Sequence, residues 1–207
     1  MDMVVNCKPE VVEYRAQECK ELFETIKIKD GKVFNLSYHQ ARVDRAYKEF
    51  FNKTSQLNLQ DILHPPKVGL FRAKVVYSAD GLVDCNFYSY KKKRIKNIML
   101  IENSAFEYRY KFKNRDFFEH LYNIYRNIDE FIITKNGYLQ DFTIGNIALL
   151  SKDDNFWHTP NEPLLFGTTL QRYLESKKLK MQKLHYTNLK NYSKIALLNA
   201  MVDFEIL

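Results

Sequence analysis

The chain has 207 residues, of which 45% are hydrophobic and 28% are charged. This composition is ordinary for a folded globular protein and excludes an intrinsically disordered chain. The 32 Lys and Arg residues exceed the 25 Asp and Glu residues and give a formal net charge of +7, which is compatible with a nucleic-acid partner and equally with an enzyme that takes anionic substrates.

The cysteines and histidines give no sign of a disulfide framework or a metal site. Cys7, Cys19 and Cys85 are widely separated, with no CxxC or Cys/His ligand spacing, and the histidines are scattered, so we expect free thiols in a reducing compartment and no metal. The N-terminus has no basic segment followed by an apolar one, and no apolar run approaches membrane-spanning length. We therefore expect a cytoplasmic protein without a membrane anchor.

The first part of the chain predicts a helix between two β-hairpins. The hairpins are expected over 22–36, with Asp30-Gly31 as the turn, and over 71–90, with a turn near Ala79 to Gly81. The helix is expected over 37–51, with Ser37 as its N-cap.

The segment KKKRIKN, 91–97, breaks this pattern and predicts a linker. Further strands are expected over 95–102, 108–113, 129–139, 145–159, near 180–186 and over 194–202, and helices over 114–127 and 168–178. The expected fold class is α+β or α/β in two parts, a small N-terminal α+β domain over 1–90 and a C-terminal domain over 91–207.

The stretch YRYKFK, 108–113, alternates aromatic and cationic residues. A strand would place Tyr108, Tyr110 and Phe112 on one face and Arg109, Lys111 and Lys113 on the other. The cations could form a solvated sheet surface, a track for nucleic-acid phosphates, or one chemically special lysine with two bystanders. The alternation alone leaves all three open.

Three other positions carry residue types suited to a site. Thr168 and Thr169 follow Gly167 at the expected start of a helix, where unpaired backbone N–H groups bind phosphate, although the same residues make an ordinary helix cap. Asp141 precedes a strand of buried character and needs a cation or hydrogen bonds there, unless it caps a turn. Arg42 on the first helix could bind a phosphate or face water.

The order of five segments resembles the class IV aminotransferase family of pyridoxal-phosphate (PLP) enzymes. The segments are LFETIKIKDGKVFNLSYHQARVDRA, YKFKNRDFFEHL, DEFIITKNGYLQDFTIGNIALL, TPNEPLLFGTTLQR and IALLNAM. The family contains branched-chain and D-amino acid aminotransferases and 4-amino-4-deoxychorismate lyases. The resemblance runs from about Glu21 to the C-terminus, and it implies the two-domain fold type IV, with a barrel-like C-terminal domain, PLP held between the domains, and a homodimer.

The resemblance also implies roles for particular residues. Lys111 in KFKNR matches the lysine that forms the Schiff base with PLP, which requires an amine desolvated enough to lose its proton. Asp141 matches the carboxylate, mostly Glu in the family, that pairs with the pyridinium nitrogen. The remaining cofactor positions are Thr143 and Asn146 after that carboxylate, and Arg42, Thr168, Thr169, Ala200 and Met201 around the phosphate.

Within the family, FETIKIKDGKV, KFKNR and LLNAM most resemble the aminodeoxychorismate lyases, which implies formation of 4-aminobenzoate and pyruvate for folate synthesis. Lys27 and Arg109 are weaker candidates for binding the substrate carboxylates. The alternative is a D-amino acid or branched-chain amino acid aminotransferase, which shares the core residues. A basic nucleic-acid-binding domain and a family member that binds PLP without efficient turnover are the remaining readings.

Overall fold

The computed structural model describes residues 3–12 and 20–207, and for residues 5–7 it describes the backbone alone. It divides into two compact units, each described by itself here. Unit 1 contains Met1–Gln17, Lys93–Arg109 and Arg115–Leu207, and unit 2 contains Glu18–Lys92 and Tyr110–Asn114.

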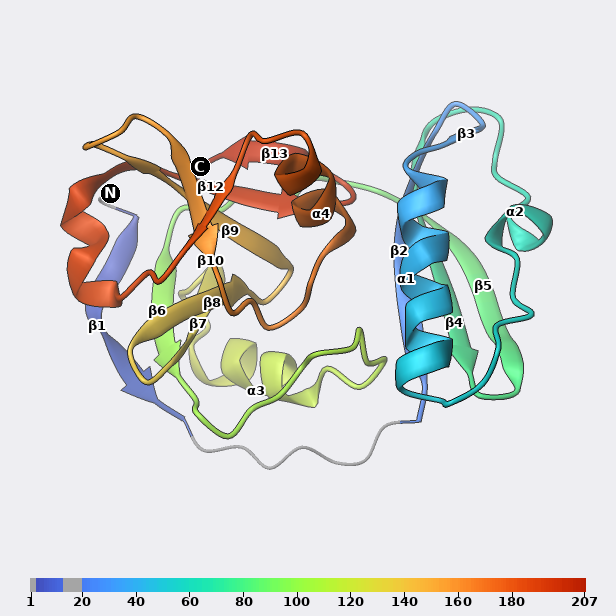
Figure 1. Ribbon diagram of the computed structural model, residues 1–207, viewed down its shortest axis with the longest axis horizontal. Coiled ribbons are helices and arrows are strands. Elements are labelled where there is room, and N and C mark those ends of the chain that lie inside the picture. Colours follow the sequence, from blue (N-terminus) through green and yellow to red (C-terminus); the bar gives the residue numbers. More distant parts are fainter. Residues whose placement is uncertain (1–2, 13–19) are drawn as a thin grey trace. The chain divides into compact units, whose positions relative to one another are not determined.

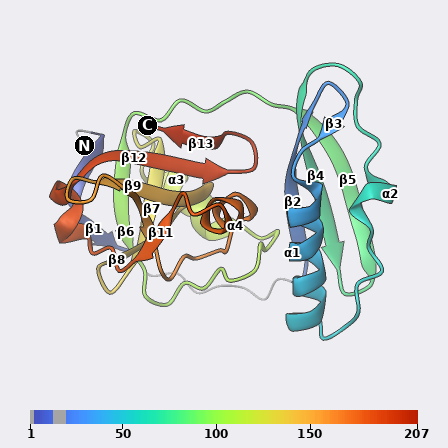
Figure 2. The same ribbon diagram turned by 45° about the horizontal axis from the view of Figure 1, so that its top comes forward.

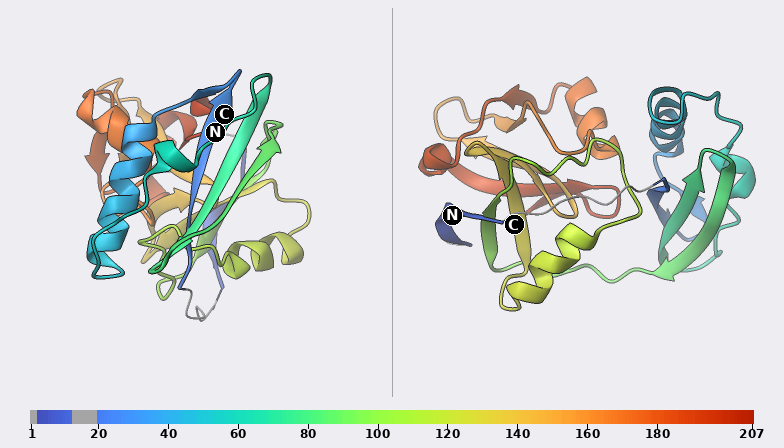
Figure 3. Two further views of the ribbon diagram at one scale, coloured as in Figure 1. Left: turned by 90° about the vertical axis from the view of Figure 1, so that its right-hand side faces the viewer. Right: turned by 90° about the horizontal axis from the view of Figure 1, so that it is seen from below.

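Unit 2 is an antiparallel sheet covered by helices (Figure 1). Its elements are β2 (Leu22–Lys29), β3 (Lys32–Val33), α1 (Leu36–Glu49), α2 (Leu59–Ile62), β4 (Leu70–Ser78) and β5 (Gly81–Ser89). The strand order is β3-β2-β4-β5. The two views in Figure 3 place α1 and α2 on the same side of this sheet, where Val43 and Leu59 pack against Ile26, Ala73 and Val75.

Both predicted hairpins and the first helix are confirmed. Asp30 and Gly31 have φ values of 49° and 74°, the left-handed conformation that a tight hairpin turn requires and that Gly adopts without strain. The helix begins at Leu36, and its N-cap residue is Asn35, two residues before the predicted Ser37, with φ 54° and no side-chain cap.

Unit 1 is built around a nine-stranded mixed sheet. Its elements are β1 (Val4–Val11), β6 (Ile98–Glu102), α3 (Asp116–Ile124), β7 (Glu130–Lys135), β8 (Tyr138–Phe142), β9 (Gly145–Ser151), β10 (Trp157–Pro160), α4 (Thr168–Glu175), β11 (Lys180–Gln182), η1 (Tyr186–Asn191), β12 (Tyr192–Asn199) and β13 (Asp203–Ile206). The main path runs β1-β6-β7-β8-β9-β10-β11, and β12 pairs with both β9 and β13. Figure 2 shows β9 and β12 side by side, with α4 next to them.

The strand predicted over 108–113 is wrong. These residues form a loop, in which an isolated bridge pairs Phe112 with Leu22. The aromatic residues are drawn into two different cores: Tyr108 packs on Phe106 and Phe118 in unit 1, whereas Phe112 packs with Phe50 in unit 2. They therefore do not form one aromatic face.

The units also differ from the predicted division into 1–90 and 91–207. The chain does leave unit 2 after Lys92, but β1 belongs to unit 1 because it pairs in parallel with β6. The segment Tyr110–Asn114 belongs to unit 2, where the carbonyl oxygen of Lys111 accepts a hydrogen bond of 2.9 Å from the backbone N–H of Phe23.

The helix α3 buries Phe117, Phe118 and Leu121, whereas Ile124 is exposed. Cys85 is a free thiol, whereas Cys19 lies outside the described residues and the side chain of Cys7 is not described. Among residues 3–12 and 20–207, no helix is long and apolar enough to span a lipid bilayer.

Candidate active site

In unit 1, Asp141 occupies a buried position with neutral partners. Its side chain is 3% exposed. One carboxylate oxygen accepts from the side-chain amide of Asn146 at 2.8 Å, and the other accepts from the backbone N–H of Leu165 at 2.9 Å. Burial raises the pKa of this carboxyl well above its ordinary value, and the hydrogen bonds oppose that rise only in part. An ionised Asp141 therefore favours a cationic ligand.

The strand pairing places Asn146 beside Asp141. The hairpin of β8 and β9 pairs Asp141 with Asn146 and Phe142 with Gly145. The amide nitrogen of Asn146 also donates to the carbonyl oxygen of Leu165 at 2.8 Å, so Asn146 joins the carboxylate to the loop that leads into α4.

That loop ends at Gly167, which is required there by close approach. A Cβ atom at this position would lie 2.1 Å from Oδ1 of Asn146. Gly167 is the N-cap residue of α4, and no side chain caps that helix within the described structure. Thr168 and Thr169 are its first two residues and are both buried, so the start of α4 lies next to Asn146 and carries the positive end of the helix dipole.

The segment that contains Ala200 and Met201 reaches the same hairpin through β12. Leu198 pairs with Asn146. Asn199 donates to the carbonyl oxygen of Ile144 at 3.2 Å and accepts from the backbone N–H of Met201 at 2.9 Å. The predicted residues Asp141, Asn146, Thr168, Thr169 and Met201 are therefore brought together within unit 1.

Thr143 has a different surrounding from the one the resemblance implies. Its hydroxyl donates to the buried carboxylate of Glu130 at 2.5 Å, and its carbonyl oxygen accepts from Arg115 at 2.8 Å. The hydroxyl is thus engaged in a network behind the hairpin turn.

In unit 2, Arg42 is held by a buried carboxylate that the sequence analysis missed. Glu24 is 0% exposed and accepts two hydrogen bonds from Arg42, at 2.7 and 2.6 Å, and one from His39 at 2.6 Å. Burial by itself would raise the pKa of Glu24, but the charge of Arg42 and the hydrogen bonds from His39 and Arg42 outweigh it and lower the pKa to about 2. The carboxylate of Glu24 therefore holds the guanidinium of Arg42 in place.

His39 completes this cluster as a neutral imidazole. Burial lowers its pKa below the ordinary value, and the nearby charge of Lys111 acts in the same direction, while Glu24 opposes the change. Because a neutral ring donates through one nitrogen only, the contact with the Glu24 carboxylate assigns the proton to Nδ1.

Two lysines of the KFKNR segment have distinct surroundings. The ammonium of Lys113 is exposed and forms an ion pair with Glu21 at 2.7 Å. Lys111 is half-buried, and its Nζ lies 4.6 Å from the centre of the Phe23 ring. Partial desolvation beside an apolar ring is the condition that an imine-forming lysine requires.

The two weaker candidates are placed as follows. The side chain of Lys27 is half-buried in β2, with Nζ 5.5 Å from the centre of the Phe34 ring. Arg109 is exposed and belongs to unit 1. Arg172 forms an ion pair with Asp203 and so joins α4 to the start of β13.

The residues missed from the sequence did leave signals. Leu22, Glu24, Ile26 and Ile28 alternate along β2 and are all fully buried, so Glu24 stands in the core register of an amphipathic strand. Val43, four residues after His39, lies on the same buried face of α1. Within the described ranges, no group of three or more His, Cys, Asp or Glu side chains is arranged to hold a metal ion.

No protein-family model matches the chain. An uncharacterized protein of Haemophilus influenzae is 29% identical over 185 residues, which span 87% of this chain and 97% of that protein. The crystal structure of a candidate 4-amino-4-deoxychorismate lyase from Haemophilus somnus is 29% identical and superposes with a TM-score of 0.76, covering 90% of this chain and 98% of that one.

Structures with lower identity share the same fold. A candidate amino-acid aminotransferase from Mesorhizobium loti superposes with a TM-score of 0.74 at 17% identity, covering 90% of this chain and 97% of that chain. A fold IV transaminase from Curtobacterium pusillum superposes with a TM-score of 0.69 at 14% identity, over 90% of this chain and 78% of that one.

The chain therefore has the mixed α+β fold of the fold type IV transaminases, and the predicted fold class is confirmed. The resemblance to class IV aminotransferases and 4-amino-4-deoxychorismate lyases is confirmed as well, since these structural neighbours are described as a candidate lyase and as aminotransferases.

Proposed function

We propose that the protein is a PLP-dependent lyase that converts 4-amino-4-deoxychorismate into 4-aminobenzoate and pyruvate. The observation that carries the proposal is the buried carboxylate of Asp141, whose hydrogen-bond partners among the described residues are neutral and which lies next to the start of α4. A pyridinium N–H would place a cation beside this carboxylate, and the first N–H groups of α4, which have no acceptor within the helix, suit a phosphate. The residues present therefore fit PLP.

PLP supplies, when bound, an electron sink that stabilises negative charge at the α-carbon of an amino substrate. The protein's own residues provide the rest. Asp141 holds the proton on the ring nitrogen, and Asn146 holds Asp141. Thr168, Thr169 and Arg42 bind the phosphate, with Arg42 oriented by Glu24. Lys111 binds the cofactor through its amine and moves the proton between substrate atoms.

We choose the lyase reaction over the aminotransferase reaction because the candidate lyase from Haemophilus somnus has a higher sequence identity to this chain than the candidate aminotransferase from Mesorhizobium loti. The Haemophilus somnus protein, described as a candidate 4-amino-4-deoxychorismate lyase, is 29% identical over nearly its whole length. A structure from Legionella pneumophila with the same description superposes with a TM-score of 0.68 at 16% identity. A mycobacterial relative was solved in a PLP-bound form, which supports the cofactor. We further propose a role in folate synthesis, and a cytoplasmic homodimer, the latter testable by light scattering.

The first experiment tests the cofactor and the lysine together. Purified protein with added PLP is reduced with borohydride and mapped by mass spectrometry. We expect the phosphopyridoxyl group on the peptide that contains Lys111, and we expect it to disappear in Lys111→Ala but to remain in Lys113→Ala, the matched control from the same segment. An adduct on Lys113 or on a surface lysine would refute the assignment.

The second experiment separates the two reaction types. With 4-amino-4-deoxychorismate, the lyase releases pyruvate and 4-aminobenzoate and leaves the cofactor as PLP. An aminotransferase would convert the cofactor to pyridoxamine phosphate in the presence of an amino acid and regenerate PLP only with a keto acid. Keto-acid-dependent turnover without release of pyruvate from 4-amino-4-deoxychorismate would favour the aminotransferase.

A further inference from the structure

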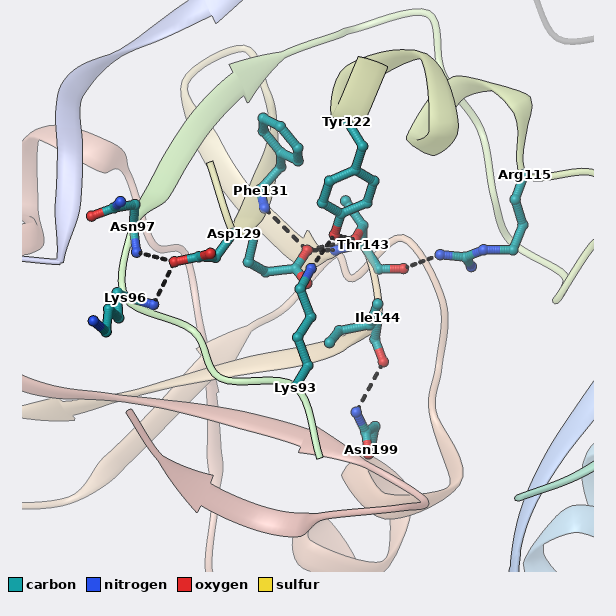
Figure 4. Close-up of polar contacts among 11 residues, drawn as sticks. Lys93, Lys96, Asn97, Arg115, Tyr122, Asp129, Phe131, Thr143, Ile144 and Asn199 are labelled. Carbon is teal, nitrogen blue, oxygen red and sulfur yellow. Dashed lines mark hydrogen bonds and ion pairs between the residues drawn. The ribbon is translucent and has the colours of Figure 1, made fainter. Parts of the chain in front are cut away.

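Side chains from other elements of unit 1 hydrogen-bond to the turn between β8 and β9. The turn consists of Thr143 and Ile144. Asp141 lies two residues before it and Asn146 two residues after it, and these two residues are paired across the hairpin. The carbonyl oxygen of Thr143 accepts from Arg115 at 2.8 Å, and the carbonyl oxygen of Ile144 accepts from Asn199 at 3.2 Å (Figure 4). The carbonyl groups of a hairpin turn are ordinarily left to water, so two side-chain contacts of this kind fix the turn more firmly than a hairpin needs.

The buried carboxylate of Glu130 accepts hydrogen bonds from the same turn. Glu130, the first residue of β7, is fully buried. Its Oε1 accepts from the backbone N–H of Thr143 at 3.1 Å and from the Thr143 hydroxyl at 2.5 Å. The hydroxyl of Tyr122 lies 2.8 Å from the Thr143 hydroxyl oxygen. Since the Thr143 hydrogen is given to Glu130, Tyr122 is the donor of that bond.

The second carboxylate oxygen of Glu130 differs from Oε1 in its hydrogen bonding. Oε2 is buried and has no hydrogen-bond partner in the part of the chain that the structure describes. The ammonium of Lys93 lies 3.7 Å from it and 3.2 Å from the Tyr122 hydroxyl. A buried carboxylate costs free energy even with a cation at this distance. A neutral apolar residue would avoid that cost but would leave the Thr143 N–H without a charged acceptor.

The position of the turn determines the position of the proposed ring-nitrogen partner. Asp141 is two residues before Thr143, and its register with Asn146 is set by the hairpin. A displacement of about 1 Å at a reacting group can cost about 100-fold in rate. Asn199, which holds Ile144, also accepts from Met201 and Val202, so the turn and the proposed phosphate segment are fixed to one another.

We propose that Glu130, Tyr122 and Arg115 are positioning residues that set Asp141 by fixing the Thr143-Ile144 turn. The proposal rests on the proposed function, because it gives these residues a role only if Asp141 binds the ring nitrogen. In the described part of the chain the Asp141 carboxylate accepts from Asn146 and Leu165, so the three residues would act on it through the backbone of the turn.

Tyr122→Phe and Thr143→Val test the proposal with small changes in volume. Tyr122→Phe removes one hydroxyl, and Thr143→Val removes the group that joins Glu130 to Tyr122. Tyr125→Phe is the matched control, because the rings of Tyr122 and Tyr125 both pack against Phe131, with centroids 5.1 and 5.9 Å away. Lys111 remains intact in all three variants, so borohydride reduction reports whether each one still binds PLP.

Three readouts separate positioning from general stability. The first is steady-state kinetics, in which we expect kcat to fall about 10- to 100-fold in Thr143→Val, less in Tyr122→Phe, with KM within about two-fold. The second is nitrogen NMR of ring-labelled PLP, in which the signal of the ring nitrogen should shift. The third is amide hydrogen exchange of the turn in the cofactor-free protein, which should quicken in both variants. Tyr125→Phe should match the parent protein in all three.

The outcomes distinguish the two proposals. An unchanged kcat and an unchanged ring-nitrogen signal in both variants, with parent protein that binds PLP on Lys111, would overturn the positioning role alone. An equal effect of Tyr125→Phe would overturn it too, because ring packing would then explain the loss. Parent protein that forms no adduct on Lys111 would overturn the proposed function together with the positioning role.

Discussion

The Glu24 cluster predicts the effect of a single change, Glu24→Gln. The substitution keeps the shape of the side chain but removes the negative charge that faces Arg42, which is 11% exposed, and His39, which is 1% exposed. Removing one partner of a buried ion pair leaves an uncompensated charge and typically costs about 3–5 kcal/mol. The charge of Arg42 and the hydrogen bonds from His39 and Arg42 lower the pKa of Glu24 despite its burial, which is the direction expected where the fold stabilises the ionised carboxylate.

We therefore expect the free energy of unfolding of unit 2 to fall by about 3–5 kcal/mol in this variant. Urea unfolding followed by circular dichroism gives the total change, while the fluorescence of Trp157, the sole tryptophan of the sequence, follows unit 1. Hydrogen exchange of peptides from β2 and α1 localises the change to unit 2. Asp80→Asn is the matched control, because Asp80 is 91% exposed in its ion pair with Lys53 and such pairs contribute little.

A loss below about 1 kcal/mol in Glu24→Gln, or an equal loss in Asp80→Asn, would refute this reasoning. Either result would mean that Arg42 finds solvent or another acceptor when Glu24 is neutral. The orientation of Arg42 for a phosphate would then not depend on Glu24.

Three further predictions concern pH, packing and the buried carboxylate. The folded-state pKa values of His39 and Glu24 are both lowered, so these two groups of unit 2 bind fewer protons in the folded than in the unfolded chain, and the stability of unit 2 should be complete above about pH 6.5 and should decline from there down to about pH 2; an unfolding free energy of unit 2, obtained from hydrogen exchange of β2 and α1 peptides, that rises on acidification would contradict this. Gly167→Ala should destabilise unit 1 by about 1–3 kcal/mol and weaken PLP binding, because the new Cβ meets Asn146; calorimetry and a PLP titration measure both, and an unchanged titration would argue against the role of Asn146. Since burial raises the pKa of Asp141, its ionised form destabilises the cofactor-free fold near neutral pH, and Asp141→Asn should be at least as stable as the parent protein while turnover is lost; a clear drop in melting temperature would contradict the pKa argument.

Local sequence signals were sufficient for most of unit 2. Its hairpins are consecutive, and Asp30-Gly31 and the segment before Gly81 have the residue types that tight turns require. The same signals failed for β1, which the sequence analysis did not predict. VVNCKPEV contains a proline and pairs in parallel with a strand far along the chain, so nothing in its neighbourhood indicates the partner.

The candidate site shows the same contrast between local and distant information. The order of segments identified Lys111, Asp141, Asn146 and Thr168. It did not reveal that Thr143 turns its hydroxyl toward Glu130, because that contact depends on the packing of β7 behind the hairpin. The alternation in YRYKFK predicted a strand. Tyr108 and Phe112 instead pack into two separate aromatic clusters, and this packing determines the conformation of the segment.

The parallel pairing of β1 with β6 also constrains how the protein is made. During synthesis, Val4 emerges from the ribosome well before its partner Ile98, and nearly all of unit 2 is translated between them. Unit 2 is almost continuous in sequence, so it can fold while the chain is still growing. The first strand must stay unpaired throughout this interval, since its neighbour in the sheet does not yet exist. A chaperone that binds nascent chains, or slow translation before β6, would therefore influence the yield of unit 1 far more than that of unit 2.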